Sequence, residues 1–221
     1  MGFLDGVIKF FQDGGSHMYP IALAMIAGWA MVIERWIYLG KSKSVNRDAF
    51  ERILPLLKKK DFNAVVEVAR STDAPIGRIV ASGLGKLQQS QSREDIEAAM
   101  EEGVMEILPR LEKRLPMIAT LANVAPLLGL FGTVMGLISA FEAVGKAAAA
   151  EKAALLSQSI SIAMNATAFG LLAAIPLLIM HSKLQAEALE IIDSIEMATL
   201  KCLNILYQQP SAGRARSAES V

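Results

Sequence analysis

The stretch LPMIATLANVAPLLGLFGTVMGLISAF, residues 115–141, runs for 27 positions without an Asp, Glu, Lys or Arg. Two further uncharged runs occupy residues 14–33, with 20 positions, and residues 153–182, with 30 positions. A hydrocarbon core of roughly 30 Å is crossed by about 20 helical residues. The three runs therefore predict an all-α integral membrane protein with three transmembrane helices. The alternative for the second and third runs, which are rich in Gly and Ala, is a buried helical hairpin of a soluble protein.

Composition restricts the classes of function that fit the chain. Its 221 residues are 53% hydrophobic, and 22 Lys and Arg balance 22 Asp and Glu, so the formal net charge is zero. A nucleic-acid-binding surface carries a basic excess, so we expect no nucleic-acid partner. Cys202 is the single cysteine, which excludes an intrachain disulfide and a multi-cysteine metal site. The sequence offers no nucleophile–base pair and no metal-ligand spacing, and we expect neither an enzyme nor a cofactor.

The distribution of Lys and Arg predicts the orientation, because loops on the cytoplasmic side of a membrane carry an excess of both. The residues before the first run contain only Lys9, and the loop between the second and third runs contains only Lys146 and Lys152. The other 19 lie after the first run, in the middle segment or after the third run. We therefore expect an external N-terminus and a cytoplasmic C-terminus. His17 and His181 lie near the predicted membrane boundaries, and we interpret both as interfacial side chains.

These observations predict eight segments, in which long helices extend from the membrane into the cytoplasm. In chain order they are an external amphipathic helix at 1–17, a transmembrane helix at 18–39, a cytoplasmic helical segment at 40–114, a transmembrane helix at 115–141, a short external loop at 142–154, a transmembrane helix at 155–181, a cytoplasmic helix at 182–208 and a disordered tail at 209–221.

Two of the cytoplasmic extensions are predicted from helical periodicity. Apolar positions recur at helical spacing after Ser92, which with Asp95 resembles a capping box. Only Pro109 and Pro116 interrupt the pattern before the second span, so we expect one helix to run from this segment into the membrane. An apolar stripe over residues 184–206 likewise predicts that the third span continues as a cytoplasmic helix.

The middle of each predicted span lacks ionisable side chains. Glu34 and Arg35 stand at the inner end of the first span, where a charge reaches the interface. A carrier that moves protons on its own normally has a titratable group in its path. This chain does not supply one.

Small residues follow one face of the second and third spans, with a threonine part-way along each stripe. The positions are Gly129, Thr133, Gly136 and Ala140 in the second span, and Ser159, Ala163, Thr167, Gly170 and Ala174 in the third. Such stripes let helix backbones approach closely, so one interpretation is tight helix packing. The other is a smooth wall that faces a pore or a foreign helix. Ser161 and Asn165 form a second polar edge on the third span, which is compatible with subunit contacts.

Three segments carry a resemblance to a known family. LANVAPLLGLFGTVMGLISAF at 121–141 and ISIAMNATAFGLLAAIP at 160–176 resemble two consecutive membrane spans of the MotA/TolQ/ExbB proton-channel family. IERWIYL at 33–39 is similar to the inner end of the family's first span. Three spans with a large cytoplasmic segment resemble ExbB and TolQ rather than the four-span MotA.

The resemblance implies a multi-pass protein of the bacterial inner membrane that forms a ring-like homo-oligomer, with a pentamer expected. Its second and third spans would line a pore that holds two helices of a single-span ExbD/TolR-like partner, and that partner would supply a membrane aspartate. Protons would be the coupling ion, and the motor would turn proton-motive force into rotation. Its work would pass to a TonB- or TolA-like protein or to a gliding-motility machine.

The resemblance also implies roles for individual residues. Thr133 and Thr167 match the family's pore-facing threonines, and the small stripes become the pore wall along which the partner helices turn. The third span departs from the family pattern, because many ExbB and TolQ sequences have a glutamate where this chain has Ile162. Asn165 also stands where an aliphatic residue is common.

Two other functions remain open from the sequence. The first is a non-conducting membrane scaffold whose small stripes only pack helices and organise partner helices. The second is an independent small-solute transporter, which the absence of an internal repeat and of a charged site at mid-membrane disfavours.

Overall fold

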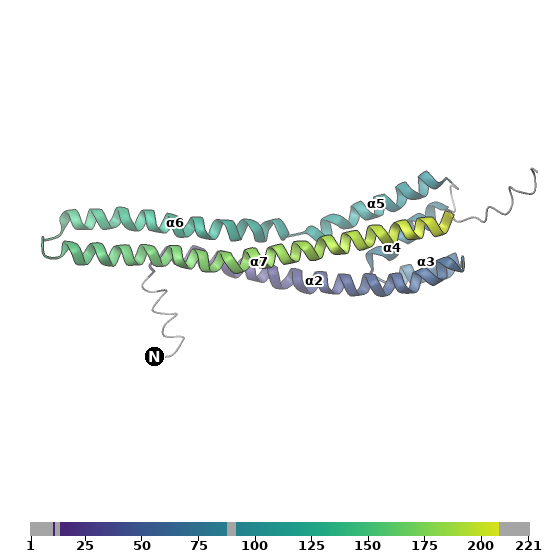
Figure 1. The fold of residues 1–221 in the computed structure, drawn as a ribbon, viewed down its shortest axis with the longest axis horizontal. Coiled ribbons are helices and arrows are strands. Elements are labelled where there is room, and N and C mark those ends of the chain that lie inside the picture. The colour runs from purple at the N-terminus through teal and green to yellow at the C-terminus, as the bar shows by residue number, and fades with distance from the viewer. Residues whose placement is uncertain (1–10, 12–13, 88–91, 208–221) are drawn as a thin grey trace, which may run out of the picture. The chain divides into compact units, whose positions relative to one another are not determined.

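The computed structural model describes residue 11, residues 14–87 and residues 92–207. The described residues form helices joined by short connections (Figure 1). In chain order the helices are α2 (Met18–Lys58), α3 (Phe62–Ser71), α4 (Pro75–Leu87), α5 (Arg93–Glu112), α6 (Leu115–Lys146) and α7 (Lys152–Tyr207). Among the described residues, three segments are long and apolar enough to cross a membrane, namely α2, the stretch 93–146 that contains α6, and α7 up to residue 206. The predicted all-α class with three long apolar helices is confirmed.

The chain divides into two compact units. The first, which we name the transmembrane unit, comprises residues 1–36 and 114–185. The second, which we name the extramembrane unit, comprises residues 37–113 and 186–221. Helices α2 and α7 each contribute one part to each unit, whereas α6 belongs to the first and α3, α4 and α5 belong to the second.

The transmembrane unit packs the first part of α2 against the α6–α7 hairpin. Its core includes Met18 and Ile21 from α2, Ala125 from α6 and Phe169 from α7, all at most 4% exposed. The ring of Phe11 meets the ring of Phe169 edge-on, with the centroids 5.0 Å apart. Within the amphipathic helix predicted at 1–17, the structure describes Phe11 and the connection at 14–17. The rest of that segment lies outside the described residues.

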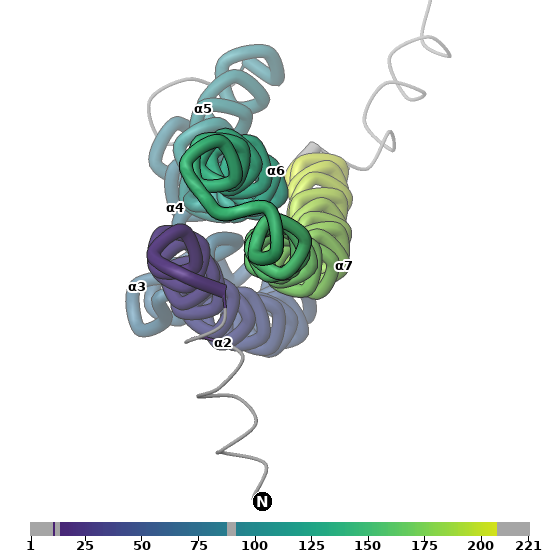
Figure 2. The backbone as a smooth tube through the Cα atoms, turned by 90° about the vertical axis from the view of Figure 1, so that its left-hand side faces the viewer, coloured from purple at the N-terminus to yellow at the C-terminus, as the bar shows by residue number. Residues whose placement is uncertain are grey.

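Helices α6 and α7 lie side by side and are joined by the connection 147–151 (Figure 1, Figure 2). This connection is shorter than the predicted loop at 142–154, because both helices continue beyond the uncharged runs. Their outer faces are apolar, and large side chains there are more than half exposed. They include Leu127, Leu130, Phe131, Phe141, Met164, Leu172, Ile175 and Ile179. Exposed apolar area on this scale is typical of a surface that meets lipid or another protein.

The extramembrane unit is built around α4, which packs against α3 and α5. Pro75 opens α4, where its missing N–H costs nothing. Asn46 of α2 is 4% exposed, and its Oδ1 accepts a hydrogen bond of 2.9 Å from the N–H of Ile76. The start of α4 is thereby tied to α2. Asp61 caps α3 in a similar way, because its Oδ1 accepts from the N–H of Ala64 at 3.2 Å.

The predicted continuous helix from the middle segment into the second span is wrong. Helix α5 ends at Glu112 and α6 begins at Leu115, with Arg114 at a positive φ of 67° between them. The ring of Pro116 would clash with the carbonyl of residue 112 in an unbroken helix, and Pro116 has no N–H to bond to it. Pro109, by contrast, lies inside α5.

The helix start predicted at Ser92 is confirmed. Ser92 occupies the N-cap position with extended backbone, but its side chain makes no capping hydrogen bond. The predicted extension of the third span does form, since α7 is continuous over 56 residues. The predicted tail at 209–221 lies outside the described residues.

Candidate functional site

The seam between α6 and α7 is closed by glycines that face backbone atoms. A Cβ atom on Gly129 would lie 2.9 Å from the carbonyl oxygen of Ala166 and 2.9 Å from the Cα of Thr167. A Cβ on Gly170 would lie 2.7 Å from the carbonyl oxygen of Ala125. Even a methyl group at either position requires the helices to move apart. The two helices therefore approach as closely as their backbones allow.

Two other small residues predicted as a pore wall, Gly136 and Ala163, also meet in this seam. A Cβ on Gly136 would lie 2.9 Å from the Cβ of Ala163, which is itself 2% exposed. Ala140 and Ala174 are buried, and Ser159 is half-buried. Within one chain, these stripes pack α6 against α7, which is the first of the two interpretations left open by the sequence. Their role as a pore wall stays a prediction.

Thr133 and Thr167 meet across the seam. The Thr167 hydroxyl donates to the carbonyl oxygen of Gly129 at 2.9 Å, and its Oγ1 lies 3.4 Å from Oγ1 of Thr133. The Thr133 hydroxyl donates to the carbonyl oxygen of Leu130 at 2.6 Å. Both residues are half-buried. Since each hydroxyl has one hydrogen and two lone pairs, both oxygens can still accept a hydrogen bond from a further donor.

A cavity of about 230 Å³ borders the seam. It is lined by His17 ahead of α2, by Ser139 of α6 and by Ser159 and Ile162 of α7, among others. The His17 ring meets the ring of Phe131 edge-on, with the centroids 6.3 Å apart. Our sequence interpretation of His17 as an interfacial side chain missed its place in this cavity. The only signal in the sequence was its position directly before the first span.

Glu34 and Arg35 form a charge cluster at the other end of the transmembrane unit. Nε and Nη2 of Arg35 donate to the two carboxylate oxygens of Glu34 at 2.8 and 2.7 Å. Arg114, at the start of α6, places Nη1 3.1 Å from the same carboxylate. The Arg35 side chain is only 4% exposed, whereas that of Glu34 is 39% exposed. A buried guanidinium is stable only when it is paired, so Glu34 has a structural role. The sequence paired Glu34 with Arg35 but gave no sign of Arg114, 80 positions away.

The second polar edge on α7 faces outward. Ser161 is exposed and Asn165 is half-buried, so both are accessible to a neighbouring molecule. Their assignment to subunit contacts stays a prediction. No group of three or more His, Cys, Asp or Glu that could hold a metal ion occurs among the described residues.

Comparison with known proteins gives one family. The model of the MotA/TolQ/ExbB proton channel family matches residues 71–197. The putative biopolymer transport protein ExbB homolog of Methanothermobacter thermautotrophicus is 28% identical over 201 residues, which covers 89% of this chain and 69% of that protein. The Tol-Pal system protein TolQ of Haemophilus influenzae is 31% identical over 171 residues, covering 72% of this chain and 73% of TolQ.

A solved structure shows the same fold. The structure of C. jejuni MotAB matches 89% of this chain and 79% of the solved chain with a TM-score of 0.52, at 18% sequence identity. The matched family is described as a proton channel and its relatives as transport and Tol-Pal proteins. Together with the three long apolar helices, these descriptions fit a multi-pass inner-membrane protein.

Proposed function

Because this chain belongs to the MotA/TolQ/ExbB proton channel family, we propose that it is the ExbB/TolQ-like stator subunit of an inner-membrane proton-driven motor. The motor converts proton-motive force into rotation around an ExbD/TolR-like dimer. The observation that carries the proposal is the pair of threonine hydroxyls, Thr133 and Thr167, that meet across the glycine seam.

A partner has to supply the acid of the proton path. The uncharged runs at 14–33, 115–141 and 153–182 contain no carboxylate or amine of their own. An aspartate on a single-span partner helix would be costly to ionise in hydrocarbon. Hydroxyl donors reduce that cost, because hydrogen bonds to a charged acceptor are stronger than those between neutral groups.

The threonine pair is suited to such a partner because its hydrogen bonds can be exchanged. The Thr167 hydrogen now points to the Gly129 carbonyl at 2.9 Å. It can rotate toward an incoming carboxylate, while the oxygen accepts from a protonated carboxyl group. Thr133, 3.4 Å away, offers a second hydroxyl to the same carboxyl group. A carboxyl group therefore finds hydrogen-bond partners in both of its protonation states.

The assembly and its placement follow from the same proposal. The exposed apolar faces of α6 and α7 would meet neighbouring copies in a homopentamer or the lipid bilayer, with the small stripes forming the wall around the partner helices. The N-terminus would lie in the periplasm and the C-terminus in the cytoplasm. Protons are the coupling ion and no cofactor is needed. Work would pass to a TonB- or TolA-like protein, for envelope transport or integrity, or to a gliding-motility protein.

The test replaces one threonine by an isostere and keeps a matched control. Thr167→Val and Thr133→Val should abolish motor output and proton flux through the partner complex, while native mass spectrometry still detects the assembled complex. Thr167→Ser should retain flux. The control is Thr120→Val, because Thr120 is exposed on α6 and its hydroxyl only bonds back to the carbonyl of Pro116 at 2.9 Å. Full activity of both valine variants would refute the assigned role.

The close packing of Gly129 and Gly170 favours a second candidate, a non-conducting scaffold that organises partner helices. In that case the valine variants would keep their activity, and the cellular process would continue when an uncoupler collapses the membrane potential. A process that stops with the uncoupler counts against the scaffold.

A further inference from the structure

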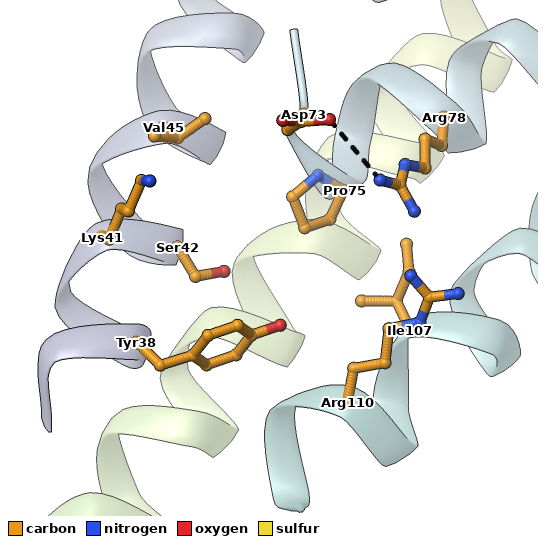
Figure 3. A pocket seen from close by; sticks show the side chains of 9 residues that line it. All are labelled: Tyr38, Lys41, Ser42, Val45, Asp73, Pro75, Arg78, Ile107 and Arg110. Carbon is orange, nitrogen blue, oxygen red and sulfur yellow. Dashed lines mark ion pairs between the residues drawn. The ribbon is translucent and has the colours of Figure 1, made fainter. Parts of the chain in front are cut away.

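The extramembrane unit contains a cavity of about 310 Å³ between α2, α4 and α5. Its size falls at the lower end of small-molecule sites, which are about 300–1,000 Å³. Figure 3 shows Tyr38 and Ser42 extending from α2 into this space, with Arg78 of α4 and Arg110 of α5 on the opposite side. Lys41 of α2 completes the polar lining together with Asp73, and apolar side chains fill the remainder.

The lining has an excess of positive charge. Lys41, Arg78 and Arg110 contribute three cations. Asp73 in the lining and Glu106, which pairs with Arg110, contribute two carboxylates, which leaves one positive charge. An Nη atom of Arg78 lies 3.7 Å from the Asp73 carboxylate, and Arg110 pairs with Glu106 of its own helix at 2.7 Å. The Asp73 side chain is fully exposed, so solvent screens its pairing with Arg78. An anion that enters the cavity can therefore compete for that guanidinium.

We propose that this cavity binds a phosphate group. Arginine forks match the geometry of phosphate oxygens, and two of them approach the cavity from different helices. The hydroxyls of Tyr38 and Ser42 can donate to the remaining oxygens from the α2 side. The apolar part of the lining accommodates the group that carries the phosphate.

Two sources share this chemistry, namely the headgroup of an anionic phospholipid and a soluble phosphate compound. The position in the chain brings the lipid within reach, because Tyr38 and Lys41 stand at the end of the predicted first span. Basic side chains directly beside a membrane attract anionic headgroups.

The first experiment measures lipid retention. Native mass spectrometry of the full chain in detergent is carried out with added phosphatidylglycerol and, separately, with phosphatidylcholine. We expect preferential retention of phosphatidylglycerol by the unmodified protein, and about tenfold weaker binding in Arg78→Gln and in Arg110→Gln, as is typical for one charge-assisted contact. Arg70→Gln is the matched control, because Arg70 is an exposed cation of α3 outside the cavity.

The second experiment uses inorganic phosphate with delipidated protein in isothermal titration calorimetry. Phosphate binding that Arg78→Gln weakens, without lipid selectivity, would support a soluble ligand. Asp73→Asn removes the carboxylate that competes for Arg78 and should strengthen binding of whichever probe, lipid or phosphate, is found to bind. A gain in affinity cannot come from misfolding, so this variant separates a charge effect from a folding defect. The proposal is overturned if neither probe binds, or if Arg70→Gln reduces binding as much as the cavity variants.

Discussion

Replacing Gly170 by alanine tests whether the glycine seam determines the separation of α6 and α7. The new Cβ would lie 2.7 Å from the carbonyl oxygen of Ala125 and 3.3 Å from the Cα of Pro126. Both neighbours are backbone atoms, so neither can rotate away and the helices must separate. Overpacking of this kind costs about 1–3 kcal/mol of unfolding free energy.

The opposing term is the helix propensity of alanine, which favours alanine over glycine by about 1 kcal/mol. Gly145 isolates that term, because it lies in the last turn of α6, is exposed and has no atom within 4 Å of an added Cβ. Gly145→Ala should therefore be neutral or slightly stabilising. Gly170→Ala should be less stable than Gly145→Ala by about 1–3 kcal/mol, as measured by reversible denaturation in mixed micelles. Equal stability of the two variants would refute the reasoning.

A compensating exchange makes the test stricter. Gly136→Ala would place a Cβ 2.9 Å from the Cβ of Ala163, and Ala163→Gly removes that atom. We expect the double variant to be more stable than the two single losses predict, with a coupling of about 0.5–2 kcal/mol. Additive losses would show that the two residues do not meet in the folded protein.

The remaining predictions concern the ion-pair cluster, the cap of α4 and the buried thiol. Glu34→Gln should lower the unfolding free energy by about 1.5–3 kcal/mol, because the buried Arg35 loses a bidentate carboxylate. The control is Glu51→Gln, which breaks an exposed pair and should lose less than about 1 kcal/mol in a denaturant titration. Equal losses in the two variants would contradict the prediction. Asn46→Ala should cost about 1–3 kcal/mol in the same titration, because it leaves the first N–H of α4 without its acceptor; an unchanged midpoint would show that this bond does not stabilise α4. Burial raises the pKa of Cys202 to about 12, so the thiolate is scarce at pH 8. Maleimide should therefore label the folded protein far more slowly than the denatured protein. Equal labelling rates would place the thiol at the surface.

The parts of the fold that depend on local sequence were predictable. Uncharged runs long enough to cross a membrane identify the three long helices, because length and the absence of charge are properties of consecutive residues. The family was recognisable from the membrane motifs for the same reason. The break before α6 was not predicted, since Lys113 and Arg114 are residues that helices accept, and a proline alone does not decide the matter: Pro116 follows the break, whereas Pro109 and Pro126 lie inside helices.

The site was only partly predictable, because its contacts join distant residues. The two stripes that contain Gly129 and Gly170 were identified, but a stripe of small residues has the same pattern whether it meets a helix of its own chain or a partner. Only the structure shows that these two glycines face backbone atoms of the same chain. Arg114 pairs with Glu34, and His17 lines the same cavity as Ile162; each arrangement joins separate segments, and no spacing in the sequence encodes it.

The glycine seam constrains what the threonine pair can do. Thr167 reaches the Gly129 carbonyl only because Gly129 has no side chain, since a Cβ atom at this position would push the two helices apart. Packing and a hydrogen-bonding role are therefore linked at this point, and a substitution that widens the seam also withdraws the Thr167 hydroxyl from Thr133. Gly129→Ala should accordingly reduce proton flux more than Gly145→Ala does, even in complexes that assemble fully. If proton flux in Gly129→Ala falls only in proportion to the loss of assembled complex, the two roles are separate and the stripes serve helix packing alone.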